Sequence, residues 1–175
     1  MEYLVDTNAL FHIIKICIDD PNNAKLDFLK DAAGCISFFV PEIVVMEIMS
    51  VIGKHIRGKS EQKNVCNRAI HGSGICQKTW TVPANKMNKK KANAFKKSCE
   101  IQFEKFKMTI ISIKPETIQR ATELLEKHAP IRNFRSLDAV VAGSVEDKLT
   151  TTVITNDKIL FKVLELEGIQ HQQLV

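Results

Sequence analysis

Hydrophobic and polar positions alternate along the chain in two recurring patterns. Runs of consecutive apolar residues are typical of strands buried on both faces, and apolar residues three or four apart are typical of amphipathic helices. The runs predict strands at residues 3–5, 35–40, 108–113 and 151–155, with a short edge strand in 169–175. The spaced pattern predicts helices at 8–18, 25–33, 41–53, 115–127, 136–144 and 158–167. This alternation predicts an α/β fold, a three-layer α/β/α sandwich around a mainly parallel sheet.

Length and composition indicate a single folded domain spanning residues 1–175. The chain is 45% hydrophobic and contains only seven Gly and five Pro, which argues against disorder. No apolar run approaches the roughly 20 residues of a membrane-spanning helix, and the chain begins with a strand instead of a targeting signal. We therefore expect a cytoplasmic protein without a membrane partner.

The spacing of the cysteine and histidine residues bears on whether the chain forms disulfides or binds zinc. The five Cys are an odd number without a C-x-x-C pair, and no two of the five His stand at helical ligand spacing. Neither a disulfide framework nor a zinc site is indicated.

Acidic residues stand where two predicted strands end. The first strand runs into Asp6, Thr7 and Asn8, and the fourth ends on Thr155-Asn156-Asp157. In an open α/β sheet the carboxyl ends of the strands form the crevice in which ligands bind, which favours a site there. The same residue types also cap helices, so the first stretch alone leaves cap and ligand at roughly even odds.

Two further acids lie on helix faces that should be buried. Glu47 shares a face with Ile43, Val44 and Val51 in the predicted helix at 41–53. A carboxylate in such a place needs a salt bridge, a proton or a metal ion. Asp138 follows Ser136, a good N-cap, near the start of a helix of small apolar residues, where the helix dipole also tolerates an acid.

The predicted topology brings Asp6, Glu47, Asp138 and Asp157 toward one crevice. Four acids without basic partners repel one another, and a hard divalent cation bound by oxygen ligands relieves the repulsion at neutral pH. We expect Mg²⁺ or Mn²⁺. An ion held in this way can activate water and neutralise charge on a phosphodiester during cleavage.

The stretch at about 54–107 is basic, and the net charge of the whole chain is +5. Eight Lys fall between positions 86 and 107 against two Glu, on a segment that looks helical. A solvated helix surface and a contact surface for phosphates both explain this pattern. The candidates for contact with a nucleic-acid backbone are Lys89, Lys90, Lys91, Lys96 and Lys97.

Four short motifs in order resemble a known family, the PIN domain of VapC-type toxin ribonucleases. They are Asp-Thr-Asn after the first strand, Pro-x-x-x-x-x-Glu at 41–47, Leu-Asp-Ala-Val-Val-Ala around Asp138, and Thr-Asn-Asp at 155–157. The resemblance implies a ribonuclease whose Mg²⁺ or Mn²⁺ site is formed by Asp6, Glu47, Asp138 and Asp157. It also implies that Thr7, Asn8, Thr155 and Asn156 orient the acids or the metal-bound water.

The resemblance covers residues 1–53 and about 108–168, and the basic stretch between them is longer than in a compact toxin of the family. It reads as a basic, largely helical insertion. The resemblance implies a parallel sheet with strand order 3-2-1-4-5, a homodimer, an RNA substrate and a small antitoxin protein that blocks the site.

Two other functions remain open. The first is a non-catalytic PIN-like module for RNA binding or assembly, with the acids as relics. The second is a phosphoryl-transfer enzyme or receiver domain with a nucleophilic Asp at a strand end. The chain lacks the Asp-x-Asp after the first strand and the partner Lys that this last function requires.

Overall fold

The computed structural model describes residues 2–20, 22–27, 37–57, 88–146 and 148–174. Within them, strands β1 (Glu2–Val5), β2 (Ser37–Pro41), β3 (Met108–Ile111), β4 (Thr151–Ile154) and β5 (Gln170–Gln172) form one parallel sheet. The strand order is β3-β2-β1-β4-β5, so the order implied by the family resemblance is confirmed.

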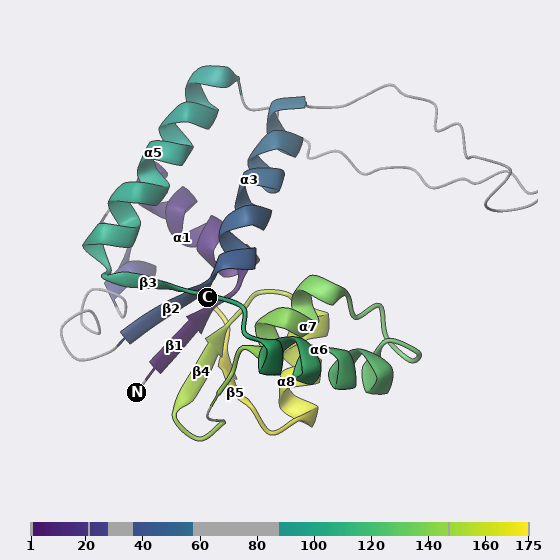
Figure 1. The fold of residues 1–175 in the computed structure, drawn as a ribbon. Coiled ribbons are helices and arrows are strands. Elements are labelled where there is room, and N and C mark those ends of the chain that lie inside the picture. The colour runs from purple at the N-terminus through teal and green to yellow at the C-terminus, as the bar shows by residue number, and fades with distance from the viewer. Residues whose placement is uncertain (1, 21, 28–36, 58–87, 147, 175) are drawn as a thin grey trace, which may run out of the picture.

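Helices cover both faces of this sheet (Figure 1). On one side lie α1 (Thr7–Asp19), α3 (Glu42–Arg57) and α5 (Lys89–Lys105), and a short 3-10 turn at Ala24–Leu26 follows α1. The other side carries α6 (Pro115–His128), α7 (Ser136–Gly143) and α8 (Lys158–Leu166). Right-handed crossovers that leave the central strand in opposite directions must pass on opposite faces, which explains this division. The predicted three-layer α/β/α architecture is confirmed.

The central strand β1 sets the register that matters for the site. Leu4 is level with Phe39 of β2 and with Val153 of β4, and Val5 is level with Ile154. Beyond the last pair, the N–H of Asp6 donates to the carbonyl of Ile154 at 3.0 Å. The residues that follow β1 and β4 therefore leave the sheet side by side.

Most predicted elements have the expected positions, and the differences are local. The predicted face of the 115–127 helix included Ile118, but this side chain is 49% exposed, while Thr117 and His128 are buried instead. The helix is thus rotated from the predicted orientation, although Ala121 of the predicted face is buried as expected. Residues 28–36 and 58–87 lie outside the described residues, and with them parts of the 25–33 helix, the 35–40 strand and the basic stretch.

Helix α5, the described part of the basic stretch, packs as a structural layer of the domain. Its buried residues recur every three or four positions, at Ala92, Phe95, Cys99, Gln102 and Phe106. The Phe95 ring stacks on Phe11 of α1 with centroids 4.9 Å apart. A buried Phe contributes roughly 1.5–3 kcal/mol of hydrophobic stabilisation, so α5 is anchored on α1 by its aromatic side chains.

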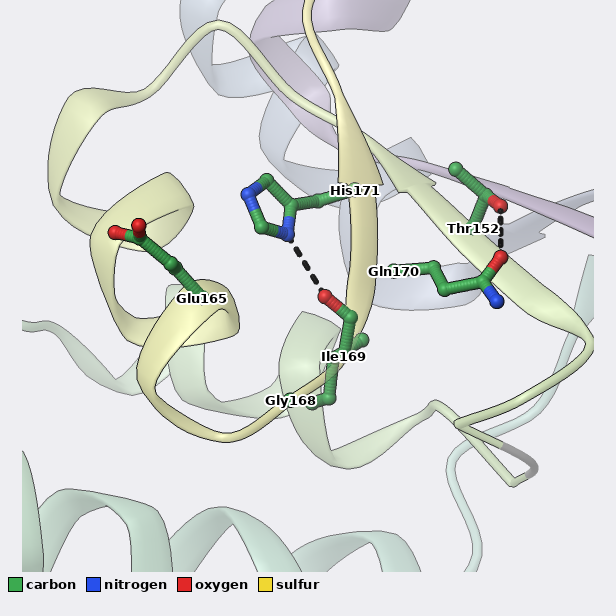
Figure 2. Close-up of a pocket in the computed structure, with 6 residues that line it drawn as sticks. All are labelled: Thr152, Glu165, Gly168, Ile169, Gln170 and His171. Carbon is green, nitrogen blue, oxygen red and sulfur yellow. Dashed lines mark hydrogen bonds between the residues drawn. The ribbon is translucent and has the colours of Figure 1, made fainter.

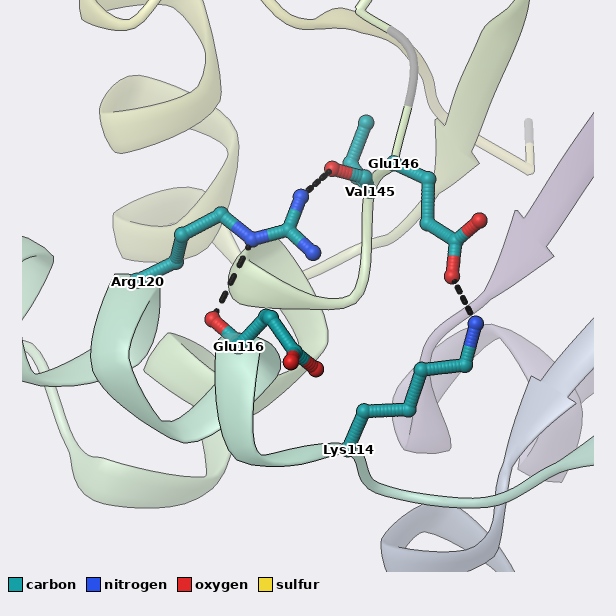
Figure 3. A network of polar contacts seen from close by, with 5 residues as sticks. All are labelled: Lys114, Glu116, Arg120, Val145 and Glu146. Atoms are coloured by element: carbon teal, nitrogen blue, oxygen red, sulfur yellow. Dashed lines mark hydrogen bonds and ion pairs between the residues drawn. The ribbon is translucent and has the colours of Figure 1, made fainter.

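Polar contacts link α6 to the segment that connects α7 with β4 (Figure 3). The guanidinium of Arg120 donates to the carbonyl of Val145 at 2.8 Å, just beyond the end of α7. The Lys114 ammonium pairs with Glu146 at 2.5 Å. The Arg120 hydrogen bond is the more important of the two contacts for the fold. It satisfies a backbone carbonyl near a helix end, where the helix itself provides no donor.

No helix among the described residues combines the length and the apolar character needed to cross a membrane.

The crossing of α6 and α7 requires a glycine. A Cβ added at Gly143 would lie 2.8 Å from the carbonyl oxygen of Thr117 and 3.0 Å from the amide nitrogen of Ala121, both backbone atoms that cannot yield freely. We expect Gly143→Ala to lower the free energy of unfolding by about 1–3 kcal/mol in urea denaturation, because the two helices must separate.

The matched control is Gly53→Ala in α3, where an added Cβ meets nothing within 4 Å. This variant should gain about 0.5–1 kcal/mol, since alanine loses less backbone entropy in a helix. Equal effects of the two substitutions would contradict the role assigned to the crossing.

Candidate functional site

Asp6 lies at the carboxyl end of the central strand and is buried, with 4% of its surface exposed. One carboxylate oxygen accepts the N–H of Thr7 at 2.6 Å, which makes Asp6 the N-cap of α1. The other accepts the hydroxyl of Thr155 at 2.8 Å. Asp6 is thus a helix cap, as one of the two sequence interpretations expected, and it is also a buried acid at the strand edge.

Thr155, fully buried after β4, connects two of the acids. Its oxygen accepts the N–H of Asp157 at 3.0 Å while its own proton is donated to Asp6. A hydroxyl has one proton, so accepting from the amide leaves that proton for the Asp6 carboxylate. Thr155 therefore fixes the orientation of Asp6 and the path of the backbone at Asp157.

Asp157 is the N-cap of α8 and is half-buried. Its Oδ1 accepts the N–H groups of Ile159 at 2.7 Å and Leu160 at 3.0 Å. The ends of β1 and β4 thus have the same arrangement, in which an Asp side chain caps the start of the next helix. Within the described residues, the second oxygen of Asp157 accepts no hydrogen bond.

Glu47 reaches the same edge from α3. Its Oε2 accepts the hydroxyl of Thr7 at 2.5 Å, a neutral hydrogen-bond partner instead of the salt bridge, proton or metal ion that the sequence analysis considered. The fully buried stripe of α3 is formed by Val44, Ile48 and Ile52, and Glu47 is half-buried at its border. The prediction that Glu47 lies in the middle of the buried face was therefore wrong by part of a turn.

Asp138 comes from α7 on the opposite helix layer and is half-buried. Its Oδ2 accepts the N–H of Arg135 at 3.2 Å. The N-cap residue is Arg135, one position before the predicted Ser136, because the Asp138 carboxylate reaches back over the first turn and takes the free amide.

The acids affect one another electrostatically. Burial is the main cause that raises the pKa of Asp6 to about 6; the negative charges of Glu47 and Asp157 act in the same direction, and the hydrogen bonds from Thr155 and Thr7 act against them. Burial likewise raises the pKa of Asp138 to about 6, with Asp157 the strongest of its negative neighbours. Within the described residues none of these four acids forms an ion pair with Lys, Arg or His.

A match to a protein-family model shows how the chain is related to known proteins. The model of the PIN domain matches residues 3–165. The chain belongs to the PIN domain family. This match covers β1 to β4, both helix layers and all four acids, so the motif resemblance is confirmed over most of the chain.

Three solved structures have a similar fold. VapBC2 from Rickettsia felis bound to a DNA fragment from its promoter has a TM-score of 0.59 at 15% identity, over 99% of this chain and 98% of that one. VapBC-1 from nontypeable Haemophilus influenzae has a TM-score of 0.54 at 15% identity, over 99% of this chain and 98% of that one. DNA-bound VapBC from Salmonella typhimurium has a TM-score of 0.58 at 13% identity, over 100% of this chain and 99% of that one. The comparison with curated proteins gives no match.

The donor set of this PIN domain fits a hard divalent cation, because it consists of carboxylates and hydroxyls with no cation paired to them. Throughout the described ranges, however, no three acidic, histidine or cysteine side chains are already gathered as ligands around one point. The acids instead accept hydrogen bonds from amides and hydroxyls. Each carboxylate oxygen has two lone pairs, so every acid keeps capacity for a further contact. The four-acid metal site stays a prediction.

Asn8 and Asn156, two of the predicted supporting residues, differ in their surroundings. Asn8 is exposed in the first turn of α1. The Oδ1 of Asn156 accepts the N–H of Leu174 at 3.0 Å, and the carbonyl of Gln172 accepts the N–H of Thr155 at 3.1 Å. The C-terminal segment thus holds the loop that carries Thr155 and Asp157, which no motif in the sequence indicated.

The predicted backbone-contact lysines lie on α5. Lys90, Lys91, Lys96 and Lys97 are exposed, and the side chain of Lys89 lies outside the described residues. At 100° per residue, Lys91 and Lys96 flank the buried stripe on opposite sides while the other two point away from it. The lysines therefore surround α5 instead of forming one face. The N-terminal end of the helix extends beyond the carboxyl edge of the sheet (Figure 1).

Two surface hollows lie elsewhere on the PIN domain and contain none of the four acids. The larger, about 470 Å³, lies beside β5 (Figure 2) and its walls include Glu165 and His171. There the hydroxyl of Thr152 donates to the side-chain oxygen of Gln170 at 3.2 Å. The other, about 290 Å³, lies between the sheet and the α6–α7 layer. Neither of these two hollows is therefore the candidate site at the carboxyl ends of β1 and β4.

The raised pKa of Asp6 predicts how stability depends on pH without divalent ions. The folded protein binds a proton at Asp6 with a pKa of about 6, against an ordinary value of 3.8. Folding therefore favours the protonated acid, so this stabilisation is complete below about pH 4 and is lost as pH rises through 6. In EDTA we expect the free energy of unfolding to fall by on the order of 2 kcal/mol between pH 4 and pH 7, measured by urea denaturation.

Asp6→Asn should remove much of this pH dependence and raise stability at pH 7, because the amide carries no charge. The control Glu123→Gln changes an exposed acid on α6 and should leave the pH profile as it is. A parent protein whose stability rises between pH 4 and 7 would contradict the environment assigned to Asp6.

Proposed function

We propose that this PIN-domain protein is a Mg²⁺- or Mn²⁺-dependent endoribonuclease that cleaves RNA phosphodiester bonds, the toxin of a toxin–antitoxin pair. Asp6, Glu47, Asp138 and Asp157 would hold the ion. The observation that carries the proposal is the convergence of these acids from β1, α3, α7 and β4 without a compensating cation among the described residues. Retaining such a cluster costs folding stability, which a bound divalent cation would offset.

The roles of individual residues follow from their contacts. Thr155 and Thr7 hold the carboxylates of Asp6 and Glu47 in fixed orientations by donating their hydroxyl protons. Caps at Asp6 and Asp157 tie the same carboxylates to rigid helix starts. A bound divalent cation would supply charge neutralisation at the phosphodiester and lower the pKa of its water. The protein contributes acids whose carboxylates these hydrogen bonds already hold in fixed orientations.

The proposed partners are supported by different observations. The lysines of α5 support contact with an RNA backbone, because cations near a nuclease edge attract phosphates. The similar structures are VapBC complexes, which supports a small antitoxin protein as partner and, with the family, a homodimer and a cytoplasmic location.

A second candidate is a PIN-like RNA-binding or assembly module without catalysis. One observation favours it: Asp6 and Asp157 are helix N-caps and Asp138 accepts the amide of the N-cap residue of α7, which is a sufficient structural reason to keep all three. Thermal melting with and without Mn²⁺ separates the candidates. A metal site is stabilised by the ion in proportion to its occupancy, and a scaffold is not.

Activity measurements test the ribonuclease directly. We expect the parent protein to cleave a fluorescent single-stranded RNA in Mg²⁺ or Mn²⁺ and to be inactive in EDTA. Asp6→Asn and Asp138→Asn should each lower kcat by roughly a hundredfold or more, because each removes a charged ligand while keeping the side-chain shape. Glu123→Gln is the control for loss of one surface charge. Undiminished cleavage by Asp6→Asn would refute the assignment.

The Thr155 hydroxyl gives a finer prediction. Thr155→Val removes the donor to Asp6 while keeping the side-chain volume, and because that hydrogen bond lowers the pKa of Asp6, its loss should raise the pKa. We expect the acidic limb of the kcat profile to move to higher pH and kcat to fall. Thr155→Ser, which keeps the hydroxyl, should restore the parent profile. Equal profiles for the Val and Ser variants would argue against the role of the hydroxyl.

A further inference from the structure

The cations of residues 114–162 differ in what their side chains contact. Five have a partner within the described residues. Lys114, Lys127 and Lys162 pair with carboxylates, and Arg120 and Lys148 donate to backbone carbonyls. In the same described segment, the side chains of Arg132, Arg135 and Lys158 have none of these contacts. Two of these three stand directly beside an acid of the site.

Arg135 is fixed next to Asp138. Its amide donates to the Asp138 carboxylate at 3.2 Å, which holds the Arg135 backbone at the start of α7, and its side chain is exposed. Lys158 is the first residue of α8, directly after the cap Asp157, and is also exposed. Because Asp157 is the strongest negative neighbour of Asp138, the two cations flank one pair of acids.

These cations do not neutralise the acids they adjoin. The charges that act on Asp6 and Asp138 belong to other acids of the cluster. A free guanidinium or ammonium beside a carboxylate would gain by pairing with it in a dry site, so exposure without pairing places the charged ends in water at the rim. A phosphate chain approaching four acids is repelled, and two cations at the rim provide the attraction that the acids lack.

We propose that Arg135 and Lys158 form a two-cation clamp on the backbone of single-stranded RNA, holding phosphates beside the one that is cut. This proposal rests on the proposed ribonuclease function and specifies where the substrate lies. The clamp belongs to the same two helix starts that present Asp138 and Asp157. It therefore sets the position of the RNA relative to these acids, whereas the lysines of α5 lie on the other side of the sheet.

Binding measurements test the clamp separately from catalysis. The background is the Asp6→Asn variant, and the probe is a fluorescein-labelled single-stranded RNA titrated at several salt concentrations. Each contact between a cation and a single-strand phosphate contributes about 0.7 to the slope of log Kd against log salt concentration. Arg135→Gln and Lys158→Gln should each lower this slope by about 0.7 and weaken binding roughly two- to fivefold.

The chain offers a matched control for each variant. Arg132→Gln removes a cation three residues before Arg135, in the segment between α6 and α7, and Lys162→Gln removes one a turn further along α8 than Lys158. Both controls should keep the parent slope. In the active protein, Arg135→Gln and Lys158→Gln should raise KM and leave kcat nearly unchanged, since the clamp holds the substrate and does not touch the reacting atoms.

Three results would overturn the clamp. The first is that Arg135→Gln and Lys158→Gln both keep the salt slope and the Kd of the parent protein. Another is an equal loss in the Arg132→Gln and Lys162→Gln controls, which would indicate only a diffuse basic surface. A third is unchanged RNA binding with weakened binding of a labelled poly-glutamate peptide, which would assign the cations to an acidic protein partner. If RNA is bound through the clamp but never cleaved, the proposed ribonuclease fails while the clamp stands.

Discussion

The hydrogen bond between the Thr155 hydroxyl and the Asp6 carboxylate is the contact on which the acidic edge depends. It joins the ends of β1 and β4, buries an acid that is only 4% exposed, and fixes the amide of Asp157 through the same oxygen. An unpaired buried carboxylate costs several kcal/mol, so this contact and the cap to Thr7 make the burial of Asp6 tolerable. The remaining cost of burying the charged carboxylate raises the pKa of Asp6.

The three-layer architecture brings the other acids to this edge from opposite sides. Glu47 arrives on α3 in one helix layer and Asp138 on α7 in the other, and these two helices contact each other beyond the sheet. The close crossing at Gly143 lets α7 pack against α6, which positions the start of α7. The two helix layers thus meet at the carboxyl ends of the central strands, which is where open parallel sheets bind ligands.

Charge is divided between the interior and the rim of the site. The acids lie inward and carry hydrogen bonds from amides and hydroxyls, whereas Arg135 and Lys158 begin two of the same helices and extend into water. The proposed nuclease function would need this separation, because a cation that paired with an acid would compete with the metal ion and would not be available to the substrate. The C-terminal segment supports the arrangement from outside by holding Asn156.

The sequence by itself determined the α/β alternation and, through its family motifs, the strand order, and it predicted the four acids as one site. These are local properties: an apolar run stays a buried strand, and a carboxylate after it stays at the strand end, whatever the rest of the chain does. It could not determine the rotations of α3 and α6 about their axes, which placed Glu47 at the border of a buried stripe and exposed Ile118. Nor could it determine which cations remain unpaired, or that Leu174 holds the loop after β4, because these contacts join residues whose separation in sequence carries no pattern. Packing decided them, and packing is a property of the tertiary structure alone.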